Sequence, residues 1–301
     1  MNSYNQVRGT PLISIVIPTY NHANYLKVAL RSIIEQNYKN WEVIIVNNNS
    51  SDNTLAIISE FNESRFCVVN IENHGVIAAS KNKGIEVARA EWIAFLDSDD
   101  SWTADKLEVV VEKINGDESL DLIYHELKIS RENFKKFRQK KLKTWKLPKS
   151  PLKSLLLRGN PIANSSVVVR KCAMEQIGCF PVSPSLIASE DYFAWLKLAA
   201  LNKKFLLIKK TMGNYLIHEN NVSNNINTDS LISAVENFRV FLNARENKKL
   251  DALIDYVSGK KLYEKGLFQD AIIIFIKNLY KADLRIKIQS LLFILFIIVQ
   301  L

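Results

Sequence analysis

Three aspartates follow directly on a short apolar run, and they are the residues in this chain best placed to do chemistry. The run covers residues 92–96, and Asp97, Asp99 and Asp100 come after it. Carboxylates that crowd together repel one another unless a cation neutralises them, and hard oxygen ligands suit Mg²⁺ or Mn²⁺. An extended backbone would place Asp97 and Asp99 on one side, and a turn would bring Asp100 close. The pattern predicts a divalent metal ion that holds phosphate oxygens.

A structural explanation of the same residues stays open at this point. Ser101 or Thr103 can cap a helix that begins near Ala104, with Asp105 in its first turn, where the helix dipole favours a carboxylate. Two aspartates separated by one residue are a common pattern when they stand alone. The choice between a cap and a metal site therefore depends on the elements around the aspartates.

The elements before the aspartates alternate between strand and helix. Short apolar runs rich in β-branched residues predict the strands, and apolar residues at helical spacing predict the helices. This alternation predicts an α/β fold with a mostly parallel sheet covered by helices on both faces, and such sheets bind ligands at the carboxyl ends of their strands. The predicted elements are, in chain order, residues 12–17, 23–36, 41–46, 54–61, 66–71, 76–90 and 93–96.

Polar residues also follow the second and third predicted strands. Residues 47–54, with the sequence NNNSSDNT, come after the second strand, and capping of the next helix by Ser51 or Asp52 would need only one of them. Residues 72–75 form the turn after the third strand. The chain has no GxGxxG and no GxxxxGKS/T sequence, so it lacks the glycines that cradle phosphates in dinucleotide-binding proteins and P-loop NTPases.

The composition is that of an ordinary globular protein with one or two domains. The chain has 301 residues, of which 48% are hydrophobic, and a net charge of +9 with a pI near 9.3. This charge favours an anionic partner, which includes a nucleotide, a nucleic acid and a membrane surface. Three cysteines without CxxC spacing, and no signal peptide before the first strand, indicate a reducing cytoplasm.

The second half of the chain is less regular. Residues 131–149 are dense in lysine and arginine, with aromatic residues among them, which is typical of a solvated surface loop and also suits RNA or a phosphate-rich bilayer. We place this segment on the side of an acceptor substrate. Further short strands and helices are predicted at residues 120–127, 152–157, 165–169, 172–177, 193–200, 204–208 and 214–217.

From Asp229 onward the pattern is helical, with helices predicted at residues 231–243, 251–263 and 269–280. The last stretch, residues 290–301, is apolar apart from one glutamine and is too short to span a bilayer, which takes about 20 residues. It can lie in an anionic membrane interface, pack as a buried terminal helix or form an oligomer contact. The basic residues just upstream of it are Lys277, Lys281, Arg285 and Lys287.

Five groups of residues match one family in type and in chain order. They are residues 14–21 (SIVIPTYN), 46–52 (VNNNSSD), 73–75 (NHG) with 81–84 (KNKG), 95–100 (FLDSDD) and 189–192 (SEDY). In this combination, which spans roughly two thirds of the chain, they resemble the family 2 glycosyltransferases of GT-A fold. The resemblance implies a Rossmann-like, mostly parallel sheet flanked by helices.

The resemblance, which does not reach the last quarter of the chain, and the helical pattern of that quarter together predict a domain division. A GT-A domain would cover residues 1–226, with a donor half at about residues 10–115 and an acceptor half at about residues 116–226. A helical C-terminal extension with an apolar tail that is a candidate for membrane association would cover residues 227–301.

The same resemblance implies a nucleotide-sugar donor, Mn²⁺ or Mg²⁺ as cofactor, and an inverting transfer. A metal and nearby cations stabilise the charge that develops on a leaving diphosphate. The implied site residues are Pro18 and Tyr20 beside the nucleobase, Asn48 at its edge, Asp97 and Ser98 near the ribose, Lys81 or Lys83 near the diphosphate, Asp99 and His218 at the metal, and Asp191 as the catalytic base.

One departure from the family concerns the nucleobase. The family usually has two aspartates where this chain has Asn47 and Asn48. An aspartate only accepts a hydrogen bond from the N–H of uracil, whereas an asparagine amide can also donate one. Recognition of uracil through the carbonyl of Asn48 stays open.

The acidic residues Glu190 and Asp191 have a structural alternative too. They stand at the predicted start of a helix, where carboxylates stabilise the helix dipole. An acceptor hydroxyl, however, needs a carboxylate within hydrogen-bond reach to take its proton, and one base opposite the leaving group suffices for inversion. The upstream motifs favour Asp191 as that base. His218, isolated in the sequence, is either a metal ligand or a structural residue.

The resemblance therefore implies a hexosyl- or N-acetylhexosaminyl-transferase that uses a UDP-sugar. Its acceptor would be a hydroxyl of a glycan or of a polyprenyl-diphosphate-linked sugar, in the synthesis of a bacterial surface polysaccharide such as lipopolysaccharide or capsule. We expect the protein in the cytoplasm, peripheral at the inner face of the plasma membrane, and without a nucleic-acid partner. The alternatives are a metal-dependent nucleotidyltransferase, which usually needs a glycine-rich basic loop, and a degenerate protein that only binds nucleotides or membranes.

Overall fold

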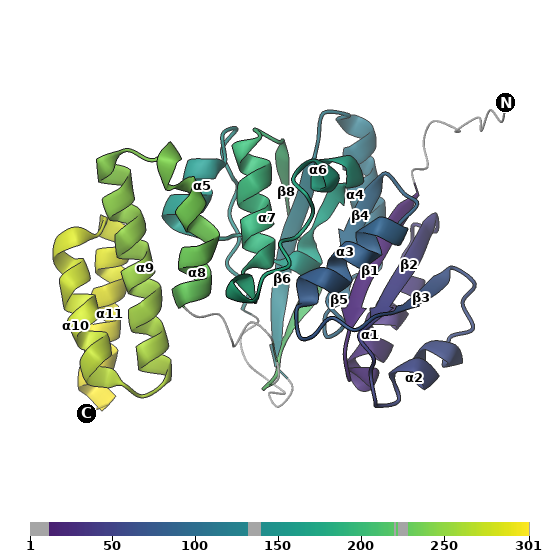
Figure 1. Ribbon diagram of the computed structural model, residues 1–301, viewed down its shortest axis with the longest axis horizontal. Helices are drawn as coiled ribbons and strands as arrows, with labels where there is room; N and C mark the ends of the chain where they lie inside the picture. Colours follow the sequence, from purple (N-terminus) through teal and green to yellow (C-terminus); the bar gives the residue numbers. More distant parts are fainter. Residues whose placement is uncertain (1–11, 132–139, 220, 222–227, 301) are drawn as a thin grey trace.

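The structure is a computed structural model that describes residues 12–131, 140–219, 221 and 228–300. Residues 132–139 of the predicted basic segment lie outside these ranges, and so does the domain boundary predicted between residues 226 and 227. Figure 1 shows a mixed sheet flanked by helices, with the last three helices side by side at the end of the molecule away from β3 and α2.

The strands of the described ranges form one sheet. They are β1 (Ile13–Thr19), β2 (Trp41–Asn47), β3 (Phe66–Asn70), β4 (Trp92–Phe95), β5 (Ser101–Trp102), β6 (Leu122–Arg131), β7 (Val168–Arg170) and β8 (Phe205–Ile217). Their spatial order is β3-β2-β1-β4-β7-β6-β8-β5. The strands β1 to β4 are parallel, as are β6 and β8, whereas β7 and β5 run antiparallel to their neighbours. The prediction of a mostly parallel sheet is confirmed.

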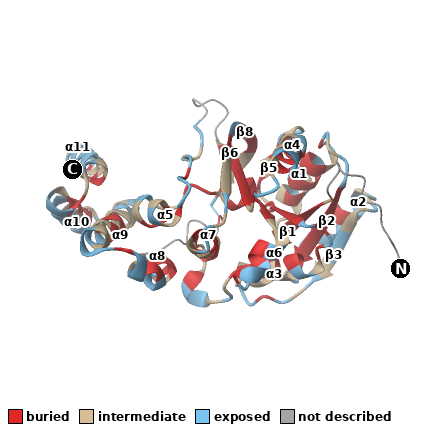
Figure 2. Ribbon diagram, turned by 90° about the horizontal axis from the view of Figure 1, so that it is seen from above, coloured by how far each residue is buried: buried red, intermediate tan, exposed pale blue. Residues whose placement is uncertain are grey.

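Helices cover both faces of this sheet, as Figure 2 shows from above. Every residue of β1 and β2 is buried, which explains why both are continuous apolar runs rather than alternating ones. On one face the side chains of β1 belong to an apolar cluster that also contains residues of α1, α2 and α4, and on the other face to a cluster that contains residues of α3. The helices of this region are α1 (Ala23–Ile34), α2 (Thr54–Glu60), α3 (Ile77–Val87), α4 (Lys106–Gly116), α5 (Leu152–Arg158), α6 (Lys171–Gln176) and α7 (Glu190–Ala200).

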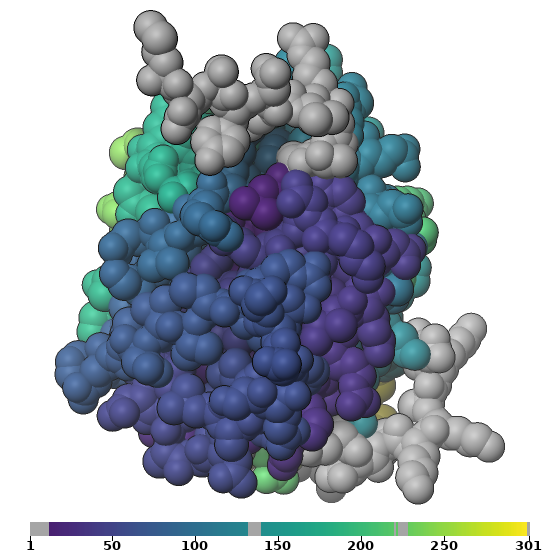
Figure 3. Space-filling view, turned by 90° about the vertical axis from the view of Figure 1, so that its right-hand side faces the viewer, coloured from purple at the N-terminus to yellow at the C-terminus, as the bar shows by residue number. Residues whose placement is uncertain are grey.

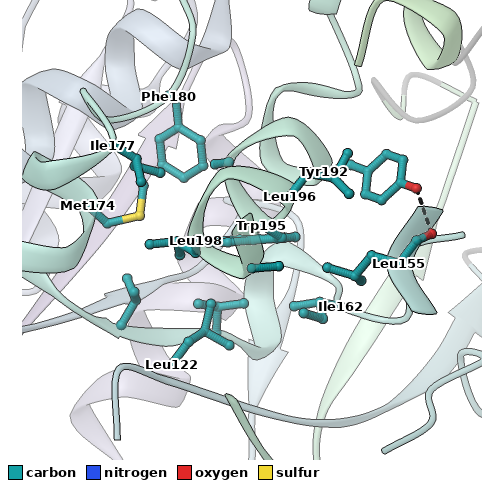
Figure 4. Packing of buried hydrophobic residues seen from close by; sticks show 14 of the residues in the cluster. Leu122, Leu155, Ile162, Met174, Ile177, Phe180, Tyr192, Trp195, Leu196 and Leu198 are labelled. Atoms are coloured by element: carbon teal, nitrogen blue, oxygen red, sulfur yellow. Dashed lines mark hydrogen bonds between the residues drawn. The ribbon is translucent and has the colours of Figure 1, made fainter. Parts of the chain in front are cut away.

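The helix α7 is anchored in the larger apolar cluster of the core, part of which Figure 4 shows. The ring of Phe180 lies 5.2 Å from that of Phe95 and 5.9 Å from that of Trp195, measured between centroids. The hydroxyl of Tyr192 donates to the carbonyl of Leu155 at 2.8 Å. These contacts fix the first turn of α7, which carries the two acidic residues predicted near the acceptor.

The two strands predicted at residues 204–208 and 214–217 are one strand, β8, so that prediction was wrong. Lys209 and Lys210 interrupt the apolar pattern because their side chains are exposed, but the backbone continues to pair with β6. The register shifts twice, on either side of Glu126, which is how a bulged ladder absorbs extra residues. Because β8 is continuous, its carboxyl end reaches the aspartates that follow β4.

The C-terminal region is helical, as predicted, with different boundaries. The predicted helix at residues 231–243 ends early, and the next one begins early because Asn243 and Glu246 form a capping box with two hydrogen bonds of 2.9 Å. None of the helices in the described ranges is long and apolar enough to cross a membrane. The helices are α8 (Thr228–Val235), a 3₁₀ turn (Glu236–Phe241), α9 (Ala244–Glu264), α10 (Phe268–Lys281) and α11 (Leu284–Gln300).

Candidate active site

A cavity of about 330 Å³ opens at the carboxyl ends of β1 and β2. All of its lining residues belong to the first hundred residues of the chain, the part drawn purple to blue in Figure 3. This is the edge of the sheet where the strand pattern places a ligand. The lining residues are Pro18, Thr19, Tyr20, Asn21, His22, Asn48, Asn73, Gly75, Ile77, Ser80 and Ser98.

Hydrogen bonds tie the loop after β1 to the loop after β2. The backbone N–H of Asn21 donates to the hydroxyl of Ser50 at 3.0 Å, and the side-chain carbonyl of Asn21 accepts from the N–H of Ser51 at 2.8 Å. Asn21 has a φ of 50°, a left-handed conformation that asparagine adopts more readily than most residues. The polar residues after β2 thereby hold the loop that carries Tyr20 at the cavity.

The two asparagines after β2 differ in their hydrogen-bond partners and in their position relative to the cavity. Asn47 is buried, and its amide nitrogen donates to the side chain of Asn70 at 2.8 Å. Asn48 lines the cavity, and its side-chain carbonyl accepts from the backbone N–H of Asn73 at 2.8 Å. Because a backbone N–H can only donate, this bond fixes which end of the Asn48 amide faces it. The NH₂ group of Asn48 is therefore the end that remains for a ligand.

The aspartates after β4 lie in a turn, which brings Asp100 close to Asp97 as expected, although the backbone from Asp97 to Asp99 is not extended. The N–H of Asp100 donates to the carbonyl of Asp97 at 3.0 Å, which closes the turn. Asp97 accepts from the amide of Asn164 at 2.8 Å, and Asp100 accepts from the N–H of Leu216 at 3.0 Å. The alternative of a helix cap is not realised, because no side chain caps α4 and Ser101 belongs to β5.

Asp99 meets the carboxyl end of β8. Its Oδ2 lies 2.9 Å from Nε2 of His218 and accepts from the amide of Asn221 at 3.0 Å. The ring of Tyr25 stacks on His218 with 4.6 Å between centroids. His22 Nδ1 lies 2.8 Å from the hydroxyl of Ser98, and burial lowers the pKa of His22, although Asp99 opposes that shift.

The donor chemistry of Asp99 and His218 fits a divalent cation whose other ligands come from a substrate. Proteins usually bind Mg²⁺ through one or two carboxylates together with substrate phosphates, and Mn²⁺ accepts oxygen and imidazole ligands. The part of the chain that the structure describes contains no group of three or more His, Cys, Asp or Glu side chains that could hold a metal alone. The pair is therefore suited to an ion that arrives with a diphosphate.

A second group of charges lies between α3 and α7. Lys81 Nζ is 2.7 Å from Glu190 Oε1, and both side chains are buried. Burial would lower the pKa of Lys81, but the charges of Glu190, Asp97 and Asp191 raise it overall. Burial raises the pKa of Asp191 to about 7, and Glu190 adds to that rise while Lys81 opposes it. Lys81 therefore stays charged, and Asp191 gains and loses its proton near neutral pH.

The structure brings most of the predicted site residues to one place. Pro18, Tyr20, Asn48 and Ser98 line the cavity. Asp97 and Asp99 flank Ser98 in sequence, and His218 contacts Asp99. Lys81 and Asp191 each interact electrostatically with Asp97. The roles of all these residues in binding and catalysis stay predictions.

Sequence reasoning missed three residues that support the site, namely His22, Asn164 and Asn221. They reach Ser98, Asp97 and Asp99 from 76, 67 and 122 residues away in the sequence. The only local signal was the position of His22 and Asn221 shortly after apolar strand patterns. Contacts across such separations are set by the fold.

Comparison with protein families gives a match to the family described as "Glycosyl transferase family 2", over residues 14–174, more than half of the chain. Escherichia coli WfgD, a "UDP-Glc:alpha-D-GlcNAc-diphosphoundecaprenol beta-1,3-glucosyltransferase", is 28% identical over 220 residues, which are 71% of this chain and 80% of WfgD. Bacillus subtilis TuaG, a "putative teichuronic acid biosynthesis glycosyltransferase", is 38% identical over 104 residues, 34% of this chain and 41% of TuaG.

Two solved structures have a similar fold. S. aureus TarS 1-349 in complex with UDP-GlcNAc superposes with a TM-score of 0.65 at 18% identity, and the match covers 91% of this chain and 82% of the TarS 1-349 chain. The mannosyltransferase PcManGT from Pyrobaculum calidifontis, in complex with GDP-Man and Mn²⁺, gives 0.61 at 16% identity, with 93% and 78% covered. These likenesses confirm the GT-A fold with its helical C-terminal region.

Proposed function

The chain belongs to glycosyl transferase family 2 and is a glycosyltransferase, and we propose that it moves a hexosyl or N-acetylhexosaminyl group from a UDP-sugar to an acceptor hydroxyl with inversion. One observation carries the proposal. The Asp99–His218 pair lies next to Ser98, which lines a cavity of about 330 Å³, a volume within the range of small-molecule sites. A cavity for a nucleoside beside a site for a metal-bound diphosphate is what a nucleotide-sugar requires.

In this proposal Pro18 and Tyr20 flank the nucleobase and Asn48 donates to a carbonyl at its edge. All three line the cavity, and the Asn48 carbonyl is already occupied by Asn73. Asp97, held by the amide of Asn164, receives the ribose together with Ser98. The names of two similar proteins support a uridine nucleotide: WfgD is a UDP-Glc transferase, and TarS was solved with UDP-GlcNAc.

Asp99 and His218 would hold Mn²⁺ or Mg²⁺, and PcManGT with its GDP-Man and Mn²⁺ supports a metal at such a site. When bound, the ion supplies positive charge to the leaving diphosphate. The side chains of these two metal ligands already have fixed partners. Asn221 donates a hydrogen bond to the carboxylate of Asp99, and the ring of Tyr25 stacks on the ring of His218. Fixed partners of this kind orient metal ligands.

Asp191 acts as the base in this proposal. It takes the proton of the acceptor hydroxyl while the hydroxyl oxygen bonds to the anomeric carbon, and the bond from that carbon to the diphosphate breaks on the opposite face. A pKa of about 7 suits proton removal near neutral pH. Lys81 was expected near the diphosphate, but its buried ion pair with Glu190 supports a positioning role beside Asp191.

We propose an acceptor linked to a polyprenyl diphosphate, at the inner face of the plasma membrane, in the synthesis of a bacterial surface polysaccharide. Support comes from the names of WfgD, which acts on a diphosphoundecaprenol-linked sugar, and of TuaG, which is assigned to teichuronic acid. The protein would be cytoplasmic and peripheral, with no nucleic-acid partner. Residues 1–226 would form the catalytic domain, and residues 227–301 a helical region that serves membrane access.

Transfer with purified protein tests this function. The protein is incubated with Mn²⁺, a panel of nucleotide sugars and a polyprenyl-diphosphate-linked N-acetylhexosamine, and the product is analysed by mass spectrometry and NMR. We expect one sugar to be added, with the opposite anomeric configuration. Asp191→Asn should lower kcat by roughly 10³-fold with donor affinity unchanged.

Asp270→Asn is the matched control, because Asp270 also stands in the first turn of a helix, α10. It should leave turnover unchanged, which separates a base from a helix-dipole effect. A product with retained configuration contradicts the inverting mechanism. Transfer of a nucleoside phosphate would support a nucleotidyltransferase, and no turnover with any donor would support a degenerate protein.

A further inference from the structure

One side of the C-terminal helix α11 is apolar and uncovered. Its inner stripe, Ile286, Ser290, Ile294 and Ile297, is buried within the C-terminal helix group. The other side stays exposed although it is just as apolar, and Figure 2 shows α11 at the end of the molecule farthest from α2. We call this exposed set the outer face of α11: Leu284, Ile288, Leu291, Leu292, Leu295, Phe296, Ile298 and Val299.

The outer face is unlike the surface of a helix that faces water. No charged residue follows Lys287 in α11, so the last three turns have no charged side. Helices that are apolar on all sides lie in a protein core or against lipid, and monomeric proteins rarely expose large contiguous apolar patches. In α10, Ile273, Ile276 and Tyr280 are exposed as well. The outer face therefore requires a partner.

Three cations gather at the first turn of α11. The guanidinium of Arg285 donates to the carbonyls of Leu157 and Arg158, each at 3.4 Å. Arg158 lies over the ring of Trp145, with 4.9 Å from its Cζ to the centroid. Partial burial and the charges of Arg285 and Arg158 lower the pKa of Lys143. Within the described ranges none of the three cations has a carboxylate partner, so their charge is not neutralised.

We propose that the outer face of α11 docks the protein on an anionic lipid bilayer, with Lys143, Arg158 and Arg285 contacting the headgroup phosphates. Charge decides against a second copy of the chain, which would bring the same net charge of +9 and the same unneutralised cations. A bilayer with anionic lipids neutralises them and also covers the apolar side chains. The docking face deepens the proposed function, and rests on it for its purpose, because a polyprenyl-linked acceptor lies in the same bilayer.

Vesicle sedimentation of the full-length protein, without donor or acceptor, tests the docking face. Vesicles of phosphatidylcholine are compared with vesicles that also contain about 30 mol% phosphatidylglycerol. We expect the partition coefficient to be on the order of a hundredfold higher for the anionic vesicles, at about 1 kcal/mol for each of the three cations, and to fall with added salt. Equal partition into both kinds of vesicle, or none into either, would overturn the proposal.

The apolar part is tested with Leu291→Gln/Leu295→Gln, two changes on exposed side chains that leave the inner stripe intact. Partition into anionic vesicles should fall about tenfold or more, because two side chains no longer enter the acyl region. The matched control is Val28→Gln/Leu201→Gln, which changes two exposed apolar residues on the sheet domain and should have no effect. Equal behaviour of the two double variants would rule out docking through α11.

The cationic part is tested with Lys143→Gln/Arg158→Gln. Partition into anionic vesicles should fall roughly 30-fold, with no change for neutral vesicles, because each of the two cations near such a surface contributes about 1 kcal/mol. Lys39→Gln/Lys209→Gln removes the same net charge from exposed positions elsewhere and serves as control. A similar loss in both variants would mean that net charge, not this cluster, attracts the bilayer.

Two further outcomes separate the alternatives. A dimer in analytical ultracentrifugation that Leu291→Gln/Leu295→Gln dissociates would assign the outer face to an interface between copies and overturn the bilayer proposal. Turnover is measured on the same samples with a water-soluble acceptor analogue, which needs no membrane. If vesicle binding is intact and no sugar is transferred, the proposed function fails while the docking face stands.

Discussion

The ammonium of Lys81 lies 2.7 Å from a carboxylate oxygen of Glu190, and the two side chains expose only 3% and 7% of their surface. Lys81 belongs to α3 and Glu190 is the first residue of α7. The negative charges of Asp97 and Asp191 also raise the pKa of Lys81. One buried cation therefore interacts both with an acid that follows β4 and with the acids at the start of α7. The donor side and the acceptor side of the proposed site are connected at this residue.

We expect Lys81→Met to lower the free energy of unfolding by about 3–5 kcal/mol, because it leaves the carboxylate of Glu190 buried without a partner. The double variant Lys81→Met/Glu190→Leu should recover most of that loss. Urea denaturation at neutral pH measures both. Lys83→Met, which removes the exposed pair with Glu86, is the control and should change stability by less than about 1 kcal/mol. Equal losses in the single and double variants would contradict a charge-pair effect.

The pH dependence of turnover follows from the raised pKa of Asp191. A base must be deprotonated to act, so kcat/KM should rise with pH through about 7 and level off above it. Below that pH the logarithm of kcat/KM should fall with a slope near one. Initial rates from acid to mildly alkaline pH test this, with metal saturation checked at each pH. A profile without a break near neutrality would argue against Asp191 as the base.

The same pKa predicts how stability depends on pH. The folded protein holds the proton of Asp191 more tightly than the unfolded chain, so folding is favoured at low pH and loses stability as pH rises from about 4 to about 7. Asp191→Asn cannot ionise and escapes this loss. The variant should be more stable than the wild type at pH 8 by up to about 4 kcal/mol, and similar to it at pH 4. Thermal or urea denaturation at the two pH values decides, and a variant less stable at pH 8 would contradict the shift.

The hydrogen bond from Asn73 to the carbonyl of Asn48 predicts how the nucleobase is recognised. Asn48→Asp keeps an acceptor for Asn73 but replaces the NH₂ group that faces the ligand. We expect UDP affinity to fall roughly tenfold, because the variant loses one hydrogen bond to the base and leaves a polar group of the base without a partner. Isothermal titration calorimetry measures it. Tighter UDP binding by the aspartate variant would mean that residue 48 accepts from the base, with the amide turned the other way.

Much of the donor side could be predicted because its signals are local. The apolar runs that became β1, β2 and β4 end directly at Pro18, Asn47 and Leu96, and parallel strands bring their carboxyl ends together. That rule was enough to place Asn48 and Asp99 at the same edge of the sheet. The resemblance to the family was needed to include the acidic residues at the start of α7 in the predicted site.

The remaining features depend on contacts that the local pattern does not contain. A lysine near strand ends is typical of phosphate binding, but the partner of Lys81 lies 109 residues further along the chain. The polar side chains of Lys209 and Lys210 indicated a break in β8, whereas pairing with β6 keeps the strand continuous. The early start of α9 follows from the capping box at Asn243, in a stretch without apolar periodicity.

The central claim is that Asp99 and His218 hold a metal ion that would bind the diphosphate of a nucleotide in the adjacent cavity. Calorimetric titration of UDP with and without Mn²⁺ tests this claim most directly. We expect UDP to bind the wild type at least about tenfold more tightly with Mn²⁺ than in chelator, and Asp99→Ala to lose that difference. Asp105→Ala, the control, removes a nearby carboxylate that pairs with Lys210 and should keep it. Metal-dependent UDP binding that survives in Asp99→Ala, or no UDP binding with any divalent metal, would contradict the account.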